Sequence, residues 1–174
     1  EGPRKEATFY TEIILRDEPH DTIPWTEQAW GHPFFKKMLY SNGTEPGNPE
    51  TPLWKHYSYS SSRSTQFMRF AEVKLIYAEA RAMSVGPDAS AYKEINDIRF
   101  RAGLPDLTPG LSAEAFRDSV IQERSWEFPE EYCARWYDLV RLQRVEEANA
   151  NRHEDELPLQ NTPSKDFYFS PIPF

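Results

Sequence analysis

The chain has 174 residues, with 20 Lys and Arg against 28 Asp and Glu, which gives a net charge of −8. Proteins that bind the phosphate backbone of nucleic acids normally carry a basic surplus, so this charge argues against a nucleic-acid partner. Aromatic residues make up 14% of the chain, whereas disordered chains are poor in them, and no apolar run approaches the roughly 20 residues of a membrane-spanning helix.

Residues 1–64 hold seven of the fifteen prolines and ten of the twenty-five aromatic residues. Proline at this density interrupts helices, so we predict an irregular loop region with one or two short strands. The segment 7–15 is the clearest strand candidate, because it is rich in β-branched and aromatic residues.

In residues 65–150 the apolar side chains recur every three or four positions, which is typical of helices. Ser112 is a suitable N-cap, and Gly103 and Pro129 are expected to end the helices that precede them. The region 151–174 is rich in proline, so we expect an extended or irregular tail. The predicted helices cover residues 65–84, 89–102, 112–128 and 132–148, an arrangement that suggests helical hairpins packed side by side.

The same spacing predicts which side chains face inward. The stripe expected in the first helix consists of Met68, Ala71, Leu75, Ala78 and Ala82, widened by Phe67, Phe70 and Tyr77. Further core residues are expected in the third and fourth helices, namely Phe116, Val120, Ile121, Trp126, Tyr132 and Trp136.

Two glutamates of the third predicted helix, Glu123 and Glu127, lie one turn apart. Two carboxyl groups can serve as the acid and base of a glycoside hydrolase. Basic residues at helical spacing nearby favour a different interpretation, in which the glutamates form ion pairs that fix helix packing. On that interpretation Arg124, Glu127, Arg135 and Asp138 form a charge cluster between the third and fourth helices.

Metal and cofactor sites are not expected from the sequence. Cys133 is the only cysteine, and the four histidines have no partners at metal-ligand spacing. Neither a glycine-rich phosphate loop nor a nucleophile elbow occurs in the chain. We therefore predict no metal, no cofactor and no catalytic residue.

Aromatic side chains in the irregular region are the candidate ligand contacts. Flat aromatic faces on proline-rich loops suit the C–H faces of sugar rings, and they also suit protein partners. The alternative for each of these aromatic side chains is that it packs its loop onto the helices and does not contact a ligand. The candidate ligand-binding residues are Trp25, Trp30, Trp54, Tyr57 and Tyr59.

Several short motifs of this chain follow one another in the same order as in a known protein family. They are RFAEVKLIYAEA at 69–80, INDIRFRAGLP at 95–105, IQERSWEF at 121–128, RWYDLVR at 135–141 and PIP at 171–173, with Gly2-Pro3-Arg4 in place of a family Asp-Pro-Arg. In this order they resemble the SusD/RagB family of glycan-capturing lipoproteins in Bacteroidetes outer membranes. Pro129 departs from the family, which tends to have Phe-Glu-Gly near this position.

The resemblance implies a mainly α fold of tetratricopeptide-like helical hairpins with long irregular loops and at most a few short strands. It implies the C-terminal part of a larger protein, with a loop region at 1–64, a helical hairpin region at 65–150 and a tail at 151–174. The lipidated N-terminal cysteine of the family is not in this chain. The resemblance also implies a surface-exposed outer-membrane lipoprotein that binds glycans or other nutrient oligomers and passes them to a SusC-like TonB-dependent transporter.

Two other functions stay open at this point. One is a glycoside hydrolase that uses Glu123 and Glu127, and the other is a helical scaffold that binds only proteins. The motif helices carry mainly Arg, Glu, Trp and small residues, which suits a scaffold for loops better than a catalytic cleft. We therefore predict that the protein is not an enzyme, and the choice between glycan and peptide cargo stays open.

Overall fold

A computed structural model describes residues 3–10, 12–14, 22–27, 32–35, 44–45, 48–52, 66–132, 134–150, 152, 154, 156 and 159–168. The chain forms two compact units that alternate along the sequence. The first unit comprises Glu1–Thr8 and Ser61–Arg135, and the second comprises Phe9–Ser60 and Trp136–Phe174. The expected division into consecutive regions at 64 and 150 stays a prediction.

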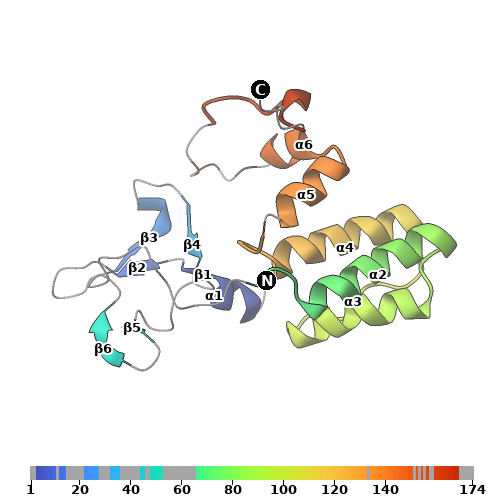
Figure 1. The fold of residues 1–174 in the computed structure, drawn as a ribbon, viewed down its shortest axis with the longest axis horizontal. Coiled ribbons are helices and arrows are strands. Elements are labelled where there is room, and N and C mark those ends of the chain that lie inside the picture. Colours follow the sequence, from blue (N-terminus) through green and yellow to red (C-terminus); the bar gives the residue numbers. More distant parts are fainter. Residues whose placement is uncertain are drawn as a thin grey trace. The chain divides into compact units, whose positions relative to one another are not determined.

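The first unit is built from helices α1 (Pro3–Thr8), α2 (Phe70–Val85), α3 (Ala89–Arg101) and α4 (Ala113–Glu127). Helices α2, α3 and α4 lie side by side, with α2 in contact with both of the others (Figure 1). Helices α2 and α3 are joined by a short turn and form the predicted hairpin. α1 contacts α4.

Small side chains on α2 define the core of this unit. Ala71, Leu75, Ala78 and Ala82 are buried along one stripe, and α3 and α4 meet it with Ala91, Ile95, Ile98, Phe116 and Val120. Alanine at three of the four α2 positions lets the neighbouring helices approach closely, because there is little side chain to hold them apart. The predicted inward residues Phe116, Val120 and Ile121 are confirmed as buried.

The large side chains expected to widen this core are exposed instead. Phe67, Met68, Phe70 and Tyr77 lie at the surface, and so do Trp126, Tyr132 and, in the second unit, Trp136. Those seven inward assignments are wrong. On α2, the narrow alanine stripe already fills the contact between helices, so Phe70 and Tyr77 are left outside it.

The helix ends follow the predicted local signals. The Ser112 hydroxyl accepts a hydrogen bond from the backbone N–H of Ala115, which caps α4. Gly103 has φ 69°, and its N–H and that of Leu104 donate to the carbonyls of Phe100 and Arg99, which is a Schellman motif. Helix α4 ends at Glu127, two residues before Pro129, as expected. Helix α2 begins at Phe70, so its start near 65 was predicted too early.

The carboxylate of Asp88 caps helix α3. It accepts hydrogen bonds from the Ser90 hydroxyl at 2.6 Å, from the backbone N–H of Ala91 at 3.0 Å and from Arg81 at 2.9 Å. These hydrogen bonds, in that order, lower the pKa of Asp88 well below its ordinary value of 3.8. The folded state favours the charged form of the Asp88 carboxylate. The stabilisation by Asp88 is therefore fully present at pH values above its ordinary pKa, and it is lost as the pH falls toward the lowered pKa of the folded state.

Replacing Asp88 by Ala is therefore expected to lower the melting temperature at neutral pH and to have a much smaller effect in strong acid. Thermal unfolding of the variant and the parent, followed by circular dichroism at about pH 7 and about pH 2, measures this difference. Asp106→Ala, at an exposed loop position, is the matched control. If Asp88→Ala lowers the melting temperature equally at both pH values, the charge of Asp88 does not have the capping role.

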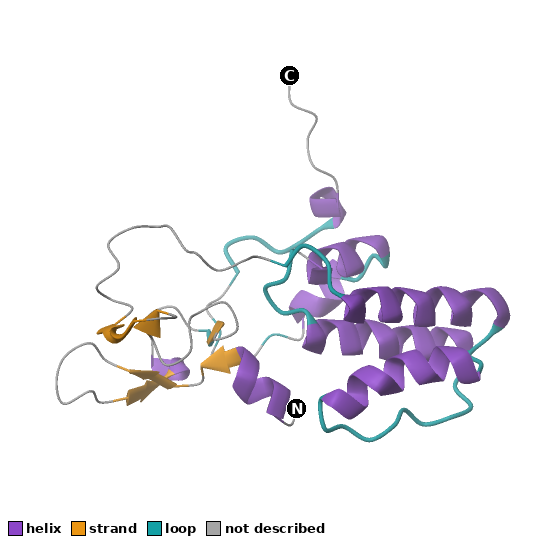
Figure 2. Ribbon diagram, turned by 60° about the horizontal axis from the view of Figure 1, so that its bottom comes forward, coloured by secondary structure: helices purple, strands orange, loops and turns teal. Residues whose placement is uncertain are grey.

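Short strand pairs characterise the second unit (Figure 2). β1 (Phe9–Tyr10) pairs with β4 (Phe34–Phe35), β2 (Glu12–Ile14) with β3 (Thr22–Pro24), and β5 (Thr44–Glu45) with β6 (Asn48–Pro52), all antiparallel. The strand candidate at 7–15 holds β1 and β2, and the region carries more strands than the one or two expected. A short 3-10 helix, η1 (Trp25–Glu27), follows β3.

The fourth predicted helix is two helices, α5 (Ala134–Arg141) and α6 (Val145–Ala150). The chain breaks between them at Gln143, which has φ 54° in the left-handed region. A further 3-10 helix, η4 (Lys165–Tyr168), follows, and the Tyr168 hydroxyl accepts a hydrogen bond from the N–H of Val145 and donates one to Glu146. The predicted fold class is confirmed, since the chain is mainly helical, and the described strands are two to five residues long and lie before residue 53.

Candidate functional site

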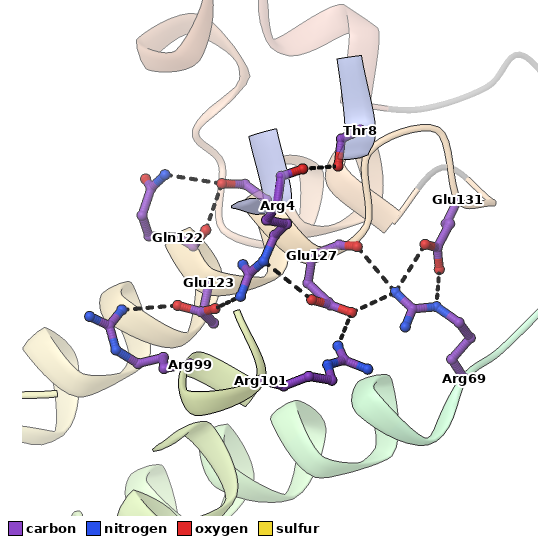
Figure 3. A network of polar contacts seen from close by, with 10 residues as sticks. Arg4, Thr8, Arg69, Arg99, Arg101, Gln122, Glu123, Glu127 and Glu131 are labelled. Carbon is purple, nitrogen blue, oxygen red and sulfur yellow. Dashed lines mark hydrogen bonds and ion pairs between the residues drawn. The ribbon is translucent and has the colours of Figure 1, made fainter. Parts of the chain in front are cut away.

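A network of arginines and glutamates links the helices of the first unit (Figure 3). Its centre is Glu123 on α4, whose side chain is 0% exposed. One carboxylate oxygen lies 2.7 Å from Arg4 of α1, and the other lies 3.0 Å from Arg99 of α3. The carboxylate thus lies between two guanidinium groups from different helices.

Glu127, one turn further along α4, is the second centre. Its carboxylate lies 2.8 Å from Arg69 and 3.5 Å from Arg4, and it also forms an ion pair with Arg101 at the end of α3. Glu127 is 7% exposed, whereas its partners Arg69 and Arg101 are 21% and 55% exposed. Three segments distant in sequence therefore meet at one side chain.

Arg69, directly before α2, connects this network to the loop after α4. It donates two hydrogen bonds to Glu131, at 2.7 and 2.9 Å, and one to the backbone carbonyl of Glu127 at 3.1 Å. Burial by itself would lower the pKa of Arg69, but the hydrogen bonds to Glu131 and Glu127 outweigh it and raise the pKa. Arg69 is therefore a permanent cation that holds the ends of α2 and α4 together.

The predicted ion-pair role of Glu123 and Glu127 is confirmed. A hydrolytic acid must hold a proton, and a nucleophile must face the substrate. Both carboxylates instead face arginines inside the helical unit. This arrangement fixes four helices relative to one another and gives no support to the hydrolase alternative.

The membership of the predicted charge cluster is partly wrong. Glu127 is buried and paired, but the partners found for it are Arg4, Arg69 and Arg101, while Arg135 is exposed. Arg124 lies 3.3 Å from Glu72 of α2. Asp138 belongs to the second unit, where it lies 3.0 Å from Arg141. The signal for the true partners was the presence of arginine in several of the motifs, including Gly2-Pro3-Arg4 and the segment from Arg69.

Of the five predicted ligand-binding aromatics, the structure describes one. Trp25 lies in η1 and is half-buried. Trp30, Trp54, Tyr57 and Tyr59 lie outside the described residues. Their expected role in ligand binding stays a prediction.

A groove of about 500 Å³ runs along the first unit between the start of α2 and the end of α3. Met68, Phe70 and Ile98 supply apolar walls, and Lys74, Asp97 and Arg101 supply charged groups. Lys74 lies 2.6 Å from Asp97 and 2.7 Å from Glu94, and hydrogen bonds from Lys74 and Lys93 lower the pKa of Asp97 to about 2. Arg69 also lines the groove, so three cations and one anion face it, and each of the three cations is ion-paired with a carboxylate.

Two further observations concern only the described part of the chain. Its acidic, histidine and cysteine side chains do not gather in groups of three or more that could hold a metal ion. None of its helices has both the length and the apolar character needed to cross a membrane.

Comparison with known proteins gives consistent matches. A sequence model of the SusD family matches residues 8–173. Two proteins of Formosa agariphila are similar: SusD-like protein P25 is 36% identical over 49% of this chain and SusD-like protein P2 is 34% identical over 51%. The chain spans about a fifth of the length of these relatives, 16% and 20% respectively.

A solved structure shows a similar fold. The crystal structure of a SusD homolog from Bacteroides thetaiotaomicron matches 96% of this chain with a TM-score of 0.58 and 23% identity. The match covers 36% of that protein's chain. At this identity the likeness establishes the fold alone.

Proposed function

Because the chain belongs to the SusD family, we propose that it is part of a non-catalytic cell-surface protein that binds glycans or other nutrient oligomers. In this proposal the whole protein is an outer-membrane lipoprotein that hands its cargo to a SusC-like TonB-dependent transporter. The observation that carries the proposal is the family match over residues 8–173, which is nearly the entire chain.

The chemistry of the first unit supports a binding role over a catalytic one. Glu123 and Glu127, the two carboxylates considered for hydrolysis, are buried against arginines in the described helices. A retaining hydrolase needs two carboxyl groups about 5 Å apart across a space that holds the sugar. Here the space beside both carboxylates is filled by guanidinium groups, so we expect no turnover of any oligosaccharide.

The proposed ligand surface lies in the loops of residues 20–60. Trp25, the described candidate, lies in the short helix η1 and is half-buried. Stacking of sugar on an indole costs little side-chain entropy, because tryptophan has only two rotatable side-chain bonds. Each stack is weak, so we expect micromolar to millimolar affinity, which suits a protein that must release its cargo.

Trp25→Ala is expected to weaken glycan binding by roughly three- to tenfold, as are Trp30→Ala and Trp54→Ala. The measurement is a glycan and peptide array on the full-length protein, followed by calorimetric titration of the strongest hit against each variant. Trp126→Ala, at the surface of α4 in the first unit, is the matched tryptophan control. Unchanged affinity in all three loop variants, with the fold intact, would place the ligand site elsewhere.

The delivery step has its own test. The full-length lipoprotein, purified from detergent-solubilised outer membranes, should carry a TonB-dependent transporter with it.

Binding of peptides and not of glycans on the array would favour peptide cargo, and binding of neither would contradict the proposed function.

A further inference from the structure

Helix α2 carries a second apolar face, opposite the one that packs in the core. Because successive helix residues are turned by about 100°, Val73 and Ala80 point roughly away from the buried Leu75 and Ala82. The four large side chains of this second face are each 45–47% exposed. The outer α2 face, as we name it, has no charged residue and consists of Val73, Ile76, Tyr77, Ala80, Met83 and Ser84.

The outward sides of the two neighbouring helices are different. Helix α3 exposes the charged residues Lys93, Asp97 and Arg101, and α4 exposes Glu114 and Gln122. A surface helix normally has polar residues on the side away from the core, whereas a helix that is apolar on two opposite sides is normally covered on both. The sequence of α2 therefore has the pattern of an interior helix, although its outer face is exposed in this structure.

The shape of the outer α2 face suits another helix. Ala80 and Ser84 lie along its middle, and small side chains at a contact let two helices approach closely, as the alanine stripe does on the buried side. The Tyr77 hydroxyl already shares a hydrogen bond with Ser90 of α3 at 3.1 Å, so Tyr77 offers mainly its ring. From Val73 to Ser84 the face is about 17 Å long, the length of a helix of about three turns.

The occupant is indicated by the length of a SusD-family protein. In the SusD homolog of known structure, 96% of this chain is matched by only 36% of that protein's chain, so the greater part of that protein lies outside the match. Helical hairpins packed in series bury their apolar sides against one another, because one hairpin cannot cover both of its own sides. Here α4 packs against one side of α2, which leaves the outer α2 face for a further helix.

We propose that the outer α2 face is an intramolecular interface. In the full-length protein, a helix from the part of the same polypeptide outside residues 1–174 covers it. This helix crosses α2 near Ala80 and Ser84 and places apolar side chains against Val73, Ile76 and Met83. The inference rests on the family and on the pattern of α2, and it does not depend on which cargo the protein binds.

The first test identifies what lies against the face. Tyr77 is replaced by the photocrosslinking residue p-benzoylphenylalanine, which keeps an aromatic ring, in the full-length protein in the cells that produce it. After irradiation, peptide mass spectrometry should find position 77 joined to a peptide of the same polypeptide from outside residues 1–174. The same replacement at Phe100, an 82% exposed ring among the charged residues of α3, is the matched control and should give few products.

The other possible products each contradict the proposal. Crosslinks to residues 9–60 or 136–174 would assign the covering role to the second unit. A crosslink to a second copy, seen as a dimer on a denaturing gel, or to a different protein would make the face an intermolecular interface. A yield no higher than that of the Phe100 control would leave the face open to solvent. Glycan binding is measured separately, so the proposed function stands or fails by its own test.

The second test measures whether the face is packed. Ala80→Glu is expected to lower the melting temperature of the full-length protein by roughly 5–10 °C, because it places a charge where the two helices are closest. Ala115→Glu makes the same change at an exposed position of α4 and should shift the melting temperature by under about 2 °C. Equally small shifts in both variants would overturn the proposal. Should Ala80→Glu fail to fold, the crosslink from position 77 decides.

Discussion

Replacing Glu123 by Gln is expected to lower the free energy of unfolding of the helical unit by roughly 3–5 kcal/mol. Glutamine keeps the size of the side chain but removes its charge, which leaves the partly buried guanidinium of Arg99 without the carboxylate that neutralises it and leaves Arg4 with Glu127 as its remaining ion-pair partner. Desolvated cations that lose their counter-charge are the costly part of such a change. Urea unfolding followed by far-ultraviolet circular dichroism measures it.

Glu114→Gln is the matched control for this experiment. Glu114 lies on the same helix α4, in its first turn, but its side chain is exposed. Removing the charge of Glu114 should lower the free energy of unfolding by under about 1 kcal/mol, which is the size of a surface interaction with the helix dipole. An equal effect of the two substitutions would show that the buried network does not contribute through its charges.

Replacing Phe116 by Ala is expected to cost about 3–5 kcal/mol of unfolding free energy. Phe116 is fully buried in the α2–α3–α4 core, and its ring packs edge to face with that of Tyr92, with the ring centres 4.9 Å apart. Alanine removes the apolar contacts of the ring and leaves a cavity that rigid helices fill only in part. The same urea unfolding experiment applies.

Phe100→Ala serves as the control for the cavity, since it deletes the same ring from an exposed position on α3. The expected change for Phe100 is within about 0.5 kcal/mol, as for most surface substitutions. A small effect at Phe116 with an unchanged slope against urea would mean that the core collapses around the deleted ring. That result would contradict the tight packing inferred from the alanine stripe.

Local signals in the sequence determined where α4 begins and where α3 and α4 end. Ser112 and Gly103 act through hydrogen bonds to residues a few positions away, and Pro129 through its own ring and missing N–H. The apolar spacing likewise located the three helices of the core, because a helix must bury one continuous stripe. The family motifs added the fold class, which the mainly helical structure confirms, and the family itself, which the match over residues 8–173 confirms.

Only the tertiary structure decided which large side chains beside the predicted stripe are outside. Ala71 and Phe70 are adjacent on α2, and hydrophobicity alone favours burying the larger one, yet Ala71 is buried and Phe70 is exposed. The separation of packed helices made this choice, because close contact through alanines leaves no room for a ring. The partners of Glu123 could not be predicted for the same kind of reason. Arg99 and Arg4 are 24 and 119 positions away in sequence, and only the packing of α1 and α3 against α4 brings their charges to one buried carboxylate.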